Sequence, residues 1–288
     1  MKFLFPKVAV LGLGLIGGSL ALDLKKKKLA KSVVGCDRSA AARRLALRRH
    51  ACDAVHADAA VAVQDADLIV LAVSVKTIPE LAKKISRHLK AGALVTDVGS
   101  TKEKLVREIL KVLPKNVVFL GGHPIAGTER SGMAAALPGL YRKRWWVLTP
   151  AAKSSSAERT STRRLSRLLR AIGAVPVLMS LREHDEILAK VSHLPHMAAY
   201  ALMHAALEMP KGRALRFAGS SFRDITRVVA SSAKMWTAIS LENRGEILQA
   251  LRRYQRILQD LTAMVEKRNP RGLEKFFEKA AQARRKLD

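Results

Sequence analysis

The chain has 288 residues, 49% hydrophobic and 26% charged, so it is long enough for two domains and apolar enough to bury a core. The formal net charge is +28, but the excess is spread over both halves of the chain and aromatic residues make up only 5%. These features argue against a nucleic-acid-binding function. Cys36 and Cys52 are too few for a disulfide scaffold or a cysteine-based zinc module, and we expect no bound metal.

The first half of the chain alternates short apolar runs with amphipathic stretches, which predicts strands and helices in turn. We expect strands at residues 7–11, 32–36, 68–73, 93–97, 117–120, 145–148 and 174–179. We expect helices from a glycine turn to about residue 28, and over 39–50, 77–89 and 101–113, with Ser39 as an N-cap. This alternation predicts an α/β fold whose N-terminal domain is a Rossmann-type, doubly wound parallel sheet.

Helical periodicity dominates after Leu181, so we predict a dinucleotide-binding domain over residues 1–180 and an all-helical domain over 181–288. The uncharged run at residues 8–22 imitates a signal peptide. It falls short of the roughly 20 residues that a membrane-spanning helix needs. We therefore expect a cytoplasmic protein that does not bind membranes.

The first predicted strand leads into a GxGxxG turn at residues 12–17, and a helix follows. In this context Gly12 permits the tight turn, Gly14 lets the backbone approach a pyrophosphate, and Gly17 lets the helix pack on the strand. The helix N-terminus offers N–H groups to phosphates. Further candidate contacts to a dinucleotide are Leu15, Ile16, Val73 and Ser74.

Asp37 closes the second predicted strand, 20 residues beyond Gly17. A carboxylate there accepts hydrogen bonds from the adenosine ribose and repels a 2′-phosphate, which favours NAD. Arg38 points the other way because an arginine can pair with a 2′-phosphate, so NADP remains an alternative.

Two polar residues follow later strands of the predicted sheet. Ser100 lies in the loop after the strand at 93–97, and His123 lies just beyond the strand at 117–120. Ligands bind at the carboxyl ends of the strands in such sheets. A histidine there can accept a proton from a hydroxyl while a hydride leaves the same carbon, so we predict that His123 and Ser100 are catalytic.

Five motifs in this order resemble the prephenate/arogenate dehydrogenase family of tyrosine biosynthesis, and the resemblance covers residues 7–270. The motifs are residues 12–20 (GLGLIGGSL), 97–102 (DVGSTK), 121–129 (GGHPIAGTE), 192–196 (SHLPH) and 222–227 (FRDITR). The resemblance implies oxidative decarboxylation of a cyclohexadienyl substrate. Hydride leaves ring C4 for the nicotinamide, the C4 hydroxyl gives up its proton to His123, and loss of CO₂ makes the ring aromatic. Ser100 would hydrogen-bond both the histidine and the hydroxyl.

The resemblance also implies a substrate site. Arg227 would bind one carboxylate, His196 would contact the other carboxylate or the side chain, and Asp185 would pair with Arg227. Glu129 and Thr128 would lie at the mouth of the site. The helical domain resembles a dimerisation domain, which implies a homodimer.

Alternatives remain open at this point. The substrate is prephenate or arogenate, and feedback inhibition by tyrosine is undecided. A β-hydroxyacid or imine reductase would share the two-domain plan, but it would not need the motif at residues 121–129. A binding protein that senses NAD without catalysis is a third possibility, which the joint presence of Ser100, His123 and Arg227 disfavours.

Overall fold

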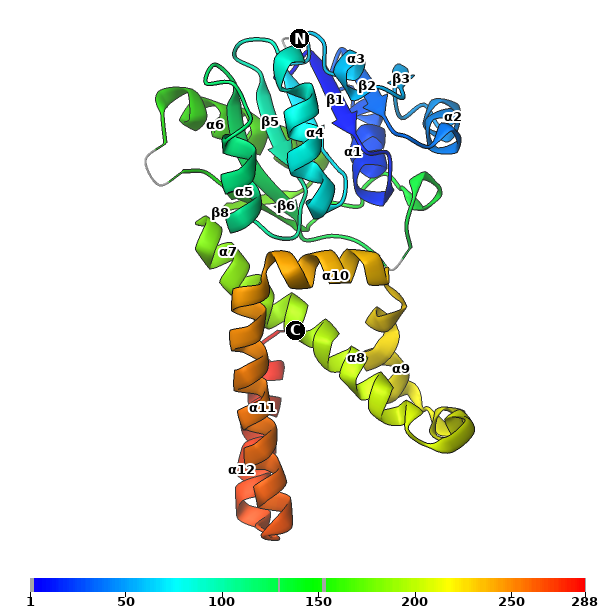
Figure 1. Cartoon of the computed structure of the whole chain (residues 1–288), viewed down its shortest axis with the longest axis vertical. Coiled ribbons are helices and arrows are strands. Elements are labelled where there is room, and N and C mark those ends of the chain that lie inside the picture. The colour runs from blue at the N-terminus through cyan, green and yellow to red at the C-terminus, as the bar shows by residue number, and fades with distance from the viewer. Residues whose placement is uncertain (1–2, 129, 152–153, 288) are drawn as a thin grey trace. The chain divides into compact units, whose positions relative to one another are not determined.

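The computed structural model describes residues 3–128, 130–151 and 154–287, and in these ranges eight strands form one sheet (Figure 1). The order across the sheet is β3-β2-β1-β4-β5-β6-β7-β8. The strands are Lys7–Leu11 (β1), Ser32–Cys36 (β2), Ala54–His56 (β3), Leu68–Leu71 (β4), Leu94–Asp97 (β5), Val118–Pro124 (β6), Trp145–Thr149 (β7) and Val175–Leu178 (β8). The strand order reverses between β1 and β4, which is where doubly wound sheets bind ligands.

Alternate residues of β1 point into two separate cores, because successive side chains of a strand face opposite sides of a sheet. Val8 and Val10 belong to the core beneath α1 and α6, whereas Ala9 and Leu11 belong to the core beneath α4 and α5. Both faces of the sheet are therefore covered. The helices and 3₁₀ turns of this region are α1 (Leu15–Lys26), α2 (Ala40–Arg48), α3 (Ala59–Ala62), α4 (Ile78–Ile85), α5 (Glu103–Leu110), α6 (Ser156–Ile172), Val75–Thr77, Ser86–His88 and Met133–Ala135.

Strand β6 departs from the prediction of a wholly parallel sheet. Its first half pairs with β5 in parallel, and its second half, from Gly121 to Pro124, pairs with β7 antiparallel. The reversal follows from the connection: β6 and β7 are joined without the helical crossover that a parallel pair requires. The sheet is therefore predominantly parallel, and β6 reaches beyond the end of β5.

Most local predictions for this region are confirmed. Ser39 is the N-cap of α2 and accepts a hydrogen bond from the backbone N–H of Ala42 at 3.2 Å. The short elements β3 and α3 were not predicted, because three- and four-residue segments carry too little periodicity.

The chain after β8 is helical. Its elements are α7 (Leu181–Leu188), a π-helical turn (Ala189–His193), α8 (Leu194–Leu207), a 3₁₀ segment (Pro210–Phe217), α9 (Ser220–Thr226), a 3₁₀ turn (Arg227–Ala230), α10 (Ala233–Glu242), α11 (Arg244–Glu266) and α12 (Pro270–Arg284). The π-helical turn was not predicted, and its wider i→i+5 hydrogen bonding places one more residue in that turn than an α-helix has. It interrupts the regular 3.6-residue spacing between α7 and α8.

The backbone divides into two compact units, one ending at Asn243 and the other beginning at Arg244. The first unit contains the whole sheet and the helices α1 to α10, and the second contains α11 and α12. The predicted boundary between residues 180 and 181 remains a prediction. In the ranges described, no helix is long and apolar enough to cross a membrane.

Candidate active site

The glycine turn between β1 and α1 packs tightly against the end of β4. Gly12 has a φ of +104°, and a Cβ on it would lie 2.2 Å from the carbonyl oxygen of Ala72. A Cβ on Gly14, in contrast, would have no heavy atom within 4 Å. The turn therefore presses on the sheet at Gly12 and leaves its backbone accessible at Gly14, as a phosphate-binding turn requires.

A cavity of about 450 Å³ lies beside this turn and brings together six of the predicted cofactor residues: Gly12, Gly14, Asp37, Arg38, Val73 and Ser74. Leu15 and Gly17 are buried in α1, and Ile16 is half-buried there. Sequence reasoning missed Thr77, Glu80 and Lys84, which also line the cavity. Their contribution depends on the packing of α4 and the preceding 3₁₀ turn against the end of β4, which no local pattern encodes.

Asp37 braces the glycine turn as well as facing the cavity. Its Oδ2 accepts a hydrogen bond from the backbone N–H of Leu13 at 2.9 Å, and its Oδ1 accepts one from Ser39 at 2.8 Å. A carboxylate has about four lone-pair sites, so acceptor capacity remains for ribose hydroxyls. These contacts fit the adenosine end of a dinucleotide.

The end of β5 is held by a fully buried ion pair. The Nζ of Lys102 donates to Asp97 Oδ2 at 2.6 Å and to the carbonyl oxygens of Gly99 and Thr101 at 2.7 and 3.1 Å. The other carboxylate oxygen of Asp97 accepts a hydrogen bond from the backbone N–H of Gly122 in β6. The pair thus fixes the loop that carries Ser100 and ties it to the strand that carries His123.

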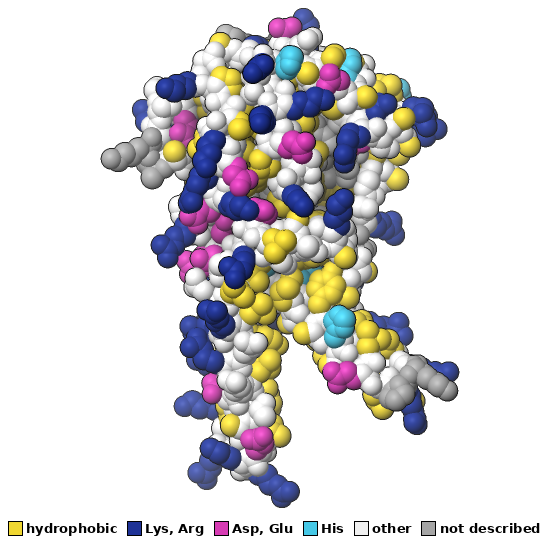
Figure 2. Space-filling view, viewed as in Figure 1, with side chains coloured by type: hydrophobic (Ala, Val, Ile, Leu, Met, Phe, Trp, Pro, Cys, Tyr) yellow, Lys and Arg dark blue, Asp and Glu magenta, His cyan; other side chains and the backbone are white. Residues whose placement is uncertain are grey.

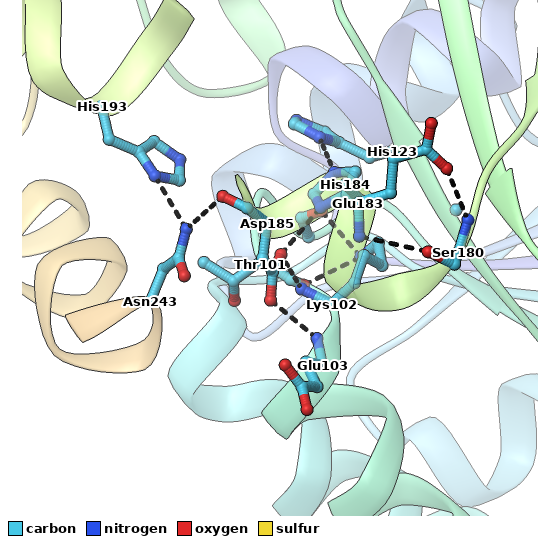
Figure 3. A network of polar contacts seen from close by, with 12 residues as sticks. Thr101, Lys102, Glu103, His123, Ser180, Glu183, His184, Asp185, His193 and Asn243 are labelled. Carbon is cyan, nitrogen blue, oxygen red and sulfur yellow. Dashed lines mark hydrogen bonds and ion pairs between the residues drawn. The ribbon is translucent and has the colours of Figure 1, made fainter. Parts of the chain in front are cut away.

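His123 is 8% exposed and makes its side-chain contact with a residue that sequence reasoning missed. Its Nδ1 lies 2.8 Å from Nε2 of His184, and Nδ1 of His184 lies 2.8 Å from Oδ1 of Asp185 (Figure 3). His184 occupies Nδ1 of that ring, so the predicted hydrogen bond from Ser100 to His123, which remains a prediction, would involve Nε2. Ser100 is half-buried in the adjoining loop.

Asp185 has partners that the sequence did not predict, and its predicted pairing with Arg227 remains a prediction. Its two carboxylate oxygens accept hydrogen bonds from the backbone N–H groups of Lys102 and Glu103, both at 2.8 Å. The carboxylate therefore stabilises the N-terminus of α5 while it contacts His184. The sequence carried one relevant signal: Ser180 and Glu183 form a capping box that fixes where α7 begins.

Burial and hydrogen bonding together determine the protonation states of His123, His184 and Asp185. It lowers the pKa of His123 well below the ordinary value, and the charges of His184, Lys102 and His193 act in the same direction. Burial also lowers the pKa of His184. Burial alone would raise the pKa of Asp185, but hydrogen bonds from His184 and Glu103 outweigh it and keep that pKa low. Near pH 7 both histidines are neutral and Asp185 is ionised.

A second group of rings lies on the helical segment, by which we mean the chain after β8, from Leu181 onward. The imidazole of His196 stacks on Trp236, with ring centroids 3.7 Å apart, and its Nδ1 donates to the carbonyl oxygen of Ser192 at 2.9 Å. Burial lowers the pKa of His196, and the nearby charge of Arg227 lowers it further. The structure thus places His196 and Arg227 within electrostatic reach of each other.

Asn243 connects the two groups. Its Nδ2 donates to the backbone oxygen of Asp185 at 2.9 Å and lies 3.2 Å from Nδ1 of His193 (Figure 3). Burial lowers the pKa of His193 to about 4, so this ring is neutral. Among the residues that the structure describes, Nε2 of His193 and Nε1 of Trp236 are buried without a hydrogen-bond partner.

The two remaining predicted substrate residues follow β6. Thr128 is exposed, and its hydroxyl accepts a hydrogen bond from the backbone N–H of Arg130. Glu129 lies outside the described residues. Across the described ranges, no cluster of three or more His, Cys, Asp or Glu residues is arranged to hold a metal ion.

A dinucleotide cradle and a buried neutral histidine at the same edge of one sheet form the arrangement of a nicotinamide-dependent dehydrogenase. The family model described as "Prephenate dehydrogenase, nucleotide-binding domain" matches residues 20–178, and "Prephenate dehydrogenase, dimerization domain" matches residues 180–279. The chain belongs to the prephenate dehydrogenase family.

Individual relatives agree with this assignment. The chain is 36% identical to the prephenate dehydrogenase of Bacillus subtilis (strain 168), over 95% of this chain and 74% of that one. Among solved structures it resembles prephenate dehydrogenase from A. aeolicus in complex with hydroxyphenyl propionate and NAD⁺, with 31% identity, 98% coverage of both chains and a TM-score of 0.91. It also resembles Synechocystis arogenate dehydrogenase, with 29% identity, coverage of 98% and 100%, and a TM-score of 0.82.

The buried ion pair leads to a stability prediction. Lys102→Met should lower the free energy of unfolding by about 3–5 kcal/mol, because it leaves the Asp97 carboxylate buried without its counter-charge. Lys104→Met is the matched control, since Lys104 makes an exposed ion pair with Glu242 and should cost less than about 1 kcal/mol. Urea unfolding of both variants measures the difference. Equal costs would show that the buried pair contributes no more than a surface pair.

Proposed function

We propose that this chain catalyses the NAD-dependent oxidation of prephenate to 4-hydroxyphenylpyruvate, with release of CO₂. The observation that carries the proposal is the position of His123, buried and neutral near the end of β6, at the edge of the sheet that also carries the glycine turn after β1. A neutral imidazole at this edge can take the proton of a substrate hydroxyl.

The cradle fits a nicotinamide dinucleotide. The accessible backbone at Gly14 and the N-terminus of α1 suit the pyrophosphate, and Asp37 suits the adenosine ribose. When bound, the nicotinamide supplies the hydride acceptor for C4 of the substrate. The negative charge of Asp37 repels the 2′-phosphate of NADP, which favours NAD. Arg38 could pair with that phosphate, so NADP is the second choice.

His123 accepts the C4 hydroxyl proton as the hydride departs, and Ser100 hydrogen-bonds the same hydroxyl. Burial keeps the ring unprotonated in the resting protein, so it enters the reaction as a base. Loss of the ring carboxylate as CO₂ then leaves an aromatic product. The electron pair of the broken C–C bond passes through the ring to the C4 oxygen, which regains a proton from His123. The residues of this chain need only hold that oxygen and exclude water during this step.

The helical segment binds the two carboxylates of the substrate. Arg227 pairs with one carboxylate, which suits its planar, two-donor guanidinium. His196 contacts the other carboxylate or the pyruvyl side chain, and Thr128 and Glu129 are further substrate-binding residues. Asp185 acts on the histidines, and its pairing with Arg227 remains part of the proposal.

Arogenate is the second candidate substrate, and His196 provides a specific reason to test it. Its Nδ1 carries the hydrogen given to Ser192, and its lowered pKa keeps Nε2 as an acceptor. An acceptor suits the ammonium group of arogenate, whereas the keto group of prephenate needs a donor. Protonation of His196 beside the substrate carboxylate would supply that donor.

We also propose that residues 1–180 and 181–288 are the functional domains, that the protein is cytoplasmic, and that it is a homodimer. The apolar surface of the helical segment supports the dimer (Figure 2). Within α8 only Ala199 is buried, although most of its residues are apolar. Exposed apolar side chains in this region include Leu202, Leu207, Phe217 and Ile225.

The reaction is tested by absorbance at 340 nm with NAD⁺ or NADP⁺ and either prephenate or arogenate. We expect reduction of NAD⁺ with prephenate. His123→Asn should lower kcat by about 10²–10⁴-fold, the usual range for loss of a general base. His88→Asn, at an exposed histidine, should leave kcat unchanged. No reduction by folded protein with any of the four pairs would refute the proposed function.

Cofactor choice depends on the charge of Asp37. Asp37→Asn should shift the ratio of kcat/KM for NAD over NADP by roughly tenfold toward NADP, because nearby unit charges at a protein surface repel by about 1–4 kcal/mol. The amide keeps the shape of the side chain and an acceptor for Leu13. Equal use of both cofactors by the unchanged protein would contradict this interpretation.

The dimer is tested by sedimentation equilibrium. We expect a mass of twice 31.5 kDa for the unchanged chain. Leu202→Glu on α8 should favour the monomer, because it places a charge in an apolar interface. Leu110→Glu, at an exposed leucine of α5, is the control and should leave the dimer intact. A monomer before any substitution would exclude the proposal.

A further inference from the structure

His184 and Asp185 are joined to His123 in a chain of hydrogen bonds that determines where the hydrogens lie. We propose that these two are positioning residues: they fix the tautomer of His123 so that its Nε2 is left as the proton acceptor. This inference rests on the proposed function, in which His123 takes the substrate proton.

Asp185 determines the tautomer of His184. The carboxylate is ionised and accepts the backbone N–H groups of Lys102 and Glu103, so it has no hydrogen to give. The 2.8 Å contact between Oδ1 and Nδ1 of His184 therefore requires the hydrogen on Nδ1. Because burial keeps this ring neutral, its Nε2 carries a lone pair.

His184 in turn determines the tautomer of His123. A lone pair on Nε2 of His184 can only accept, so the 2.8 Å contact requires the hydrogen on Nδ1 of His123. The rings meet edge to edge at a centroid distance of 5.0 Å and an angle of 64°, which suits an in-plane hydrogen bond. Since His123 is also neutral, its Nε2 is the nitrogen that can take a proton.

The charges around the two rings come from several elements. Lys102, before α5, and His193, in the π-helical turn, disfavour protonation of His123, and Asp97 of β5 favours protonation of His184. Asp185, on α7, favours a proton on His184 as well. After proton transfer, the ionised Asp185 stabilises the new positive charge through His184, as a carboxylate behind a histidine does in other general-base sites.

The chain is held rigidly at its outer end. The backbone oxygen of Asp185 accepts the hydrogen bond from Asn243, and its carboxylate grips the first residues of α5. One residue thus determines both the hydrogen positions on the two rings and the location of the loop ahead of α5. The loop includes Ser100, so Asp185 helps to position both Ser100, which would bind the substrate hydroxyl, and His123, which would take its proton.

Two substitutions of His184 test the proposal by turnover. The Oε1 of Gln in His184→Gln can accept the hydrogen of His123 Nδ1, so this variant should retain most of kcat. His184→Leu cannot accept it and should lower kcat by about 10–100-fold, a typical cost of losing a positioning partner. KM should be unchanged in both, because neither side chain touches substrate. Equal kcat for both variants and the unchanged protein would overturn the proposal.

Asp185→Asn adds a pH readout that a purely structural role would not move. Removing the negative charge lowers the pKa of His123, so the acid limb of the kcat/KM profile should shift to lower pH. The unfolding midpoint of this variant reports any separate loss of helix stability. An acid limb that stays in place while kcat is unchanged would contradict the role of Asp185.

A spectroscopic measurement separates this inference from the proposed function. Nitrogen-15 NMR of histidine-labelled protein with NAD bound should show hydrogen on Nδ1, not Nε2, of His123, with the signal identified by its loss in His123→Asn. Hydrogen on Nε2 would overturn the inference whatever the substrate. Failure to oxidise prephenate or arogenate with the expected tautomer present would instead refute only the proposed function.

Discussion

A buried ammonium–carboxylate contact between Lys102 and Asp97 holds together the edge of the sheet on which the chemistry depends. Both side chains are fully buried, and each also binds backbone groups of a neighbouring segment. Desolvating two charges is costly, so such a pair is stable only when every donor and acceptor is satisfied. Here the pair joins the end of β5, the loop with Ser100 and the strand with His123 into one rigid unit.

The histidines next to this unit are buried, and the carboxylate of Asp185 contacts the second of them, His184. Burial keeps His123 and His184 neutral, and the carboxylate of Asp185 remains ionised because N–H groups surround it. The same packing that gives the region its stability thus produces a base in the required protonation state. Asn243 extends the network to His193 and the ring cluster of the helical segment.

Features encoded by neighbouring residues were predictable from the sequence. The glycine turn, the cap at Ser39 and most strand positions follow from local spacing. The antiparallel pairing of β6 with β7 and the role of His184 were not predictable, because both depend on contacts between residues more than 20 positions apart. Lys102 shows the limit clearly: its sequence neighbours are polar, and only the assembled sheet makes it fully buried.

The close packing around Gly122 restricts how this family of sites can change. A Cβ at this position would lie 2.6 Å from the backbone oxygen of Asp97, so any larger residue would push β6 away from β5. The residue next to the base is therefore strongly restricted during evolution, although it has no side chain and takes no part in the reaction. Drift in substrate preference would have to occur on the helical segment, while the strand that holds His123 stays unchanged.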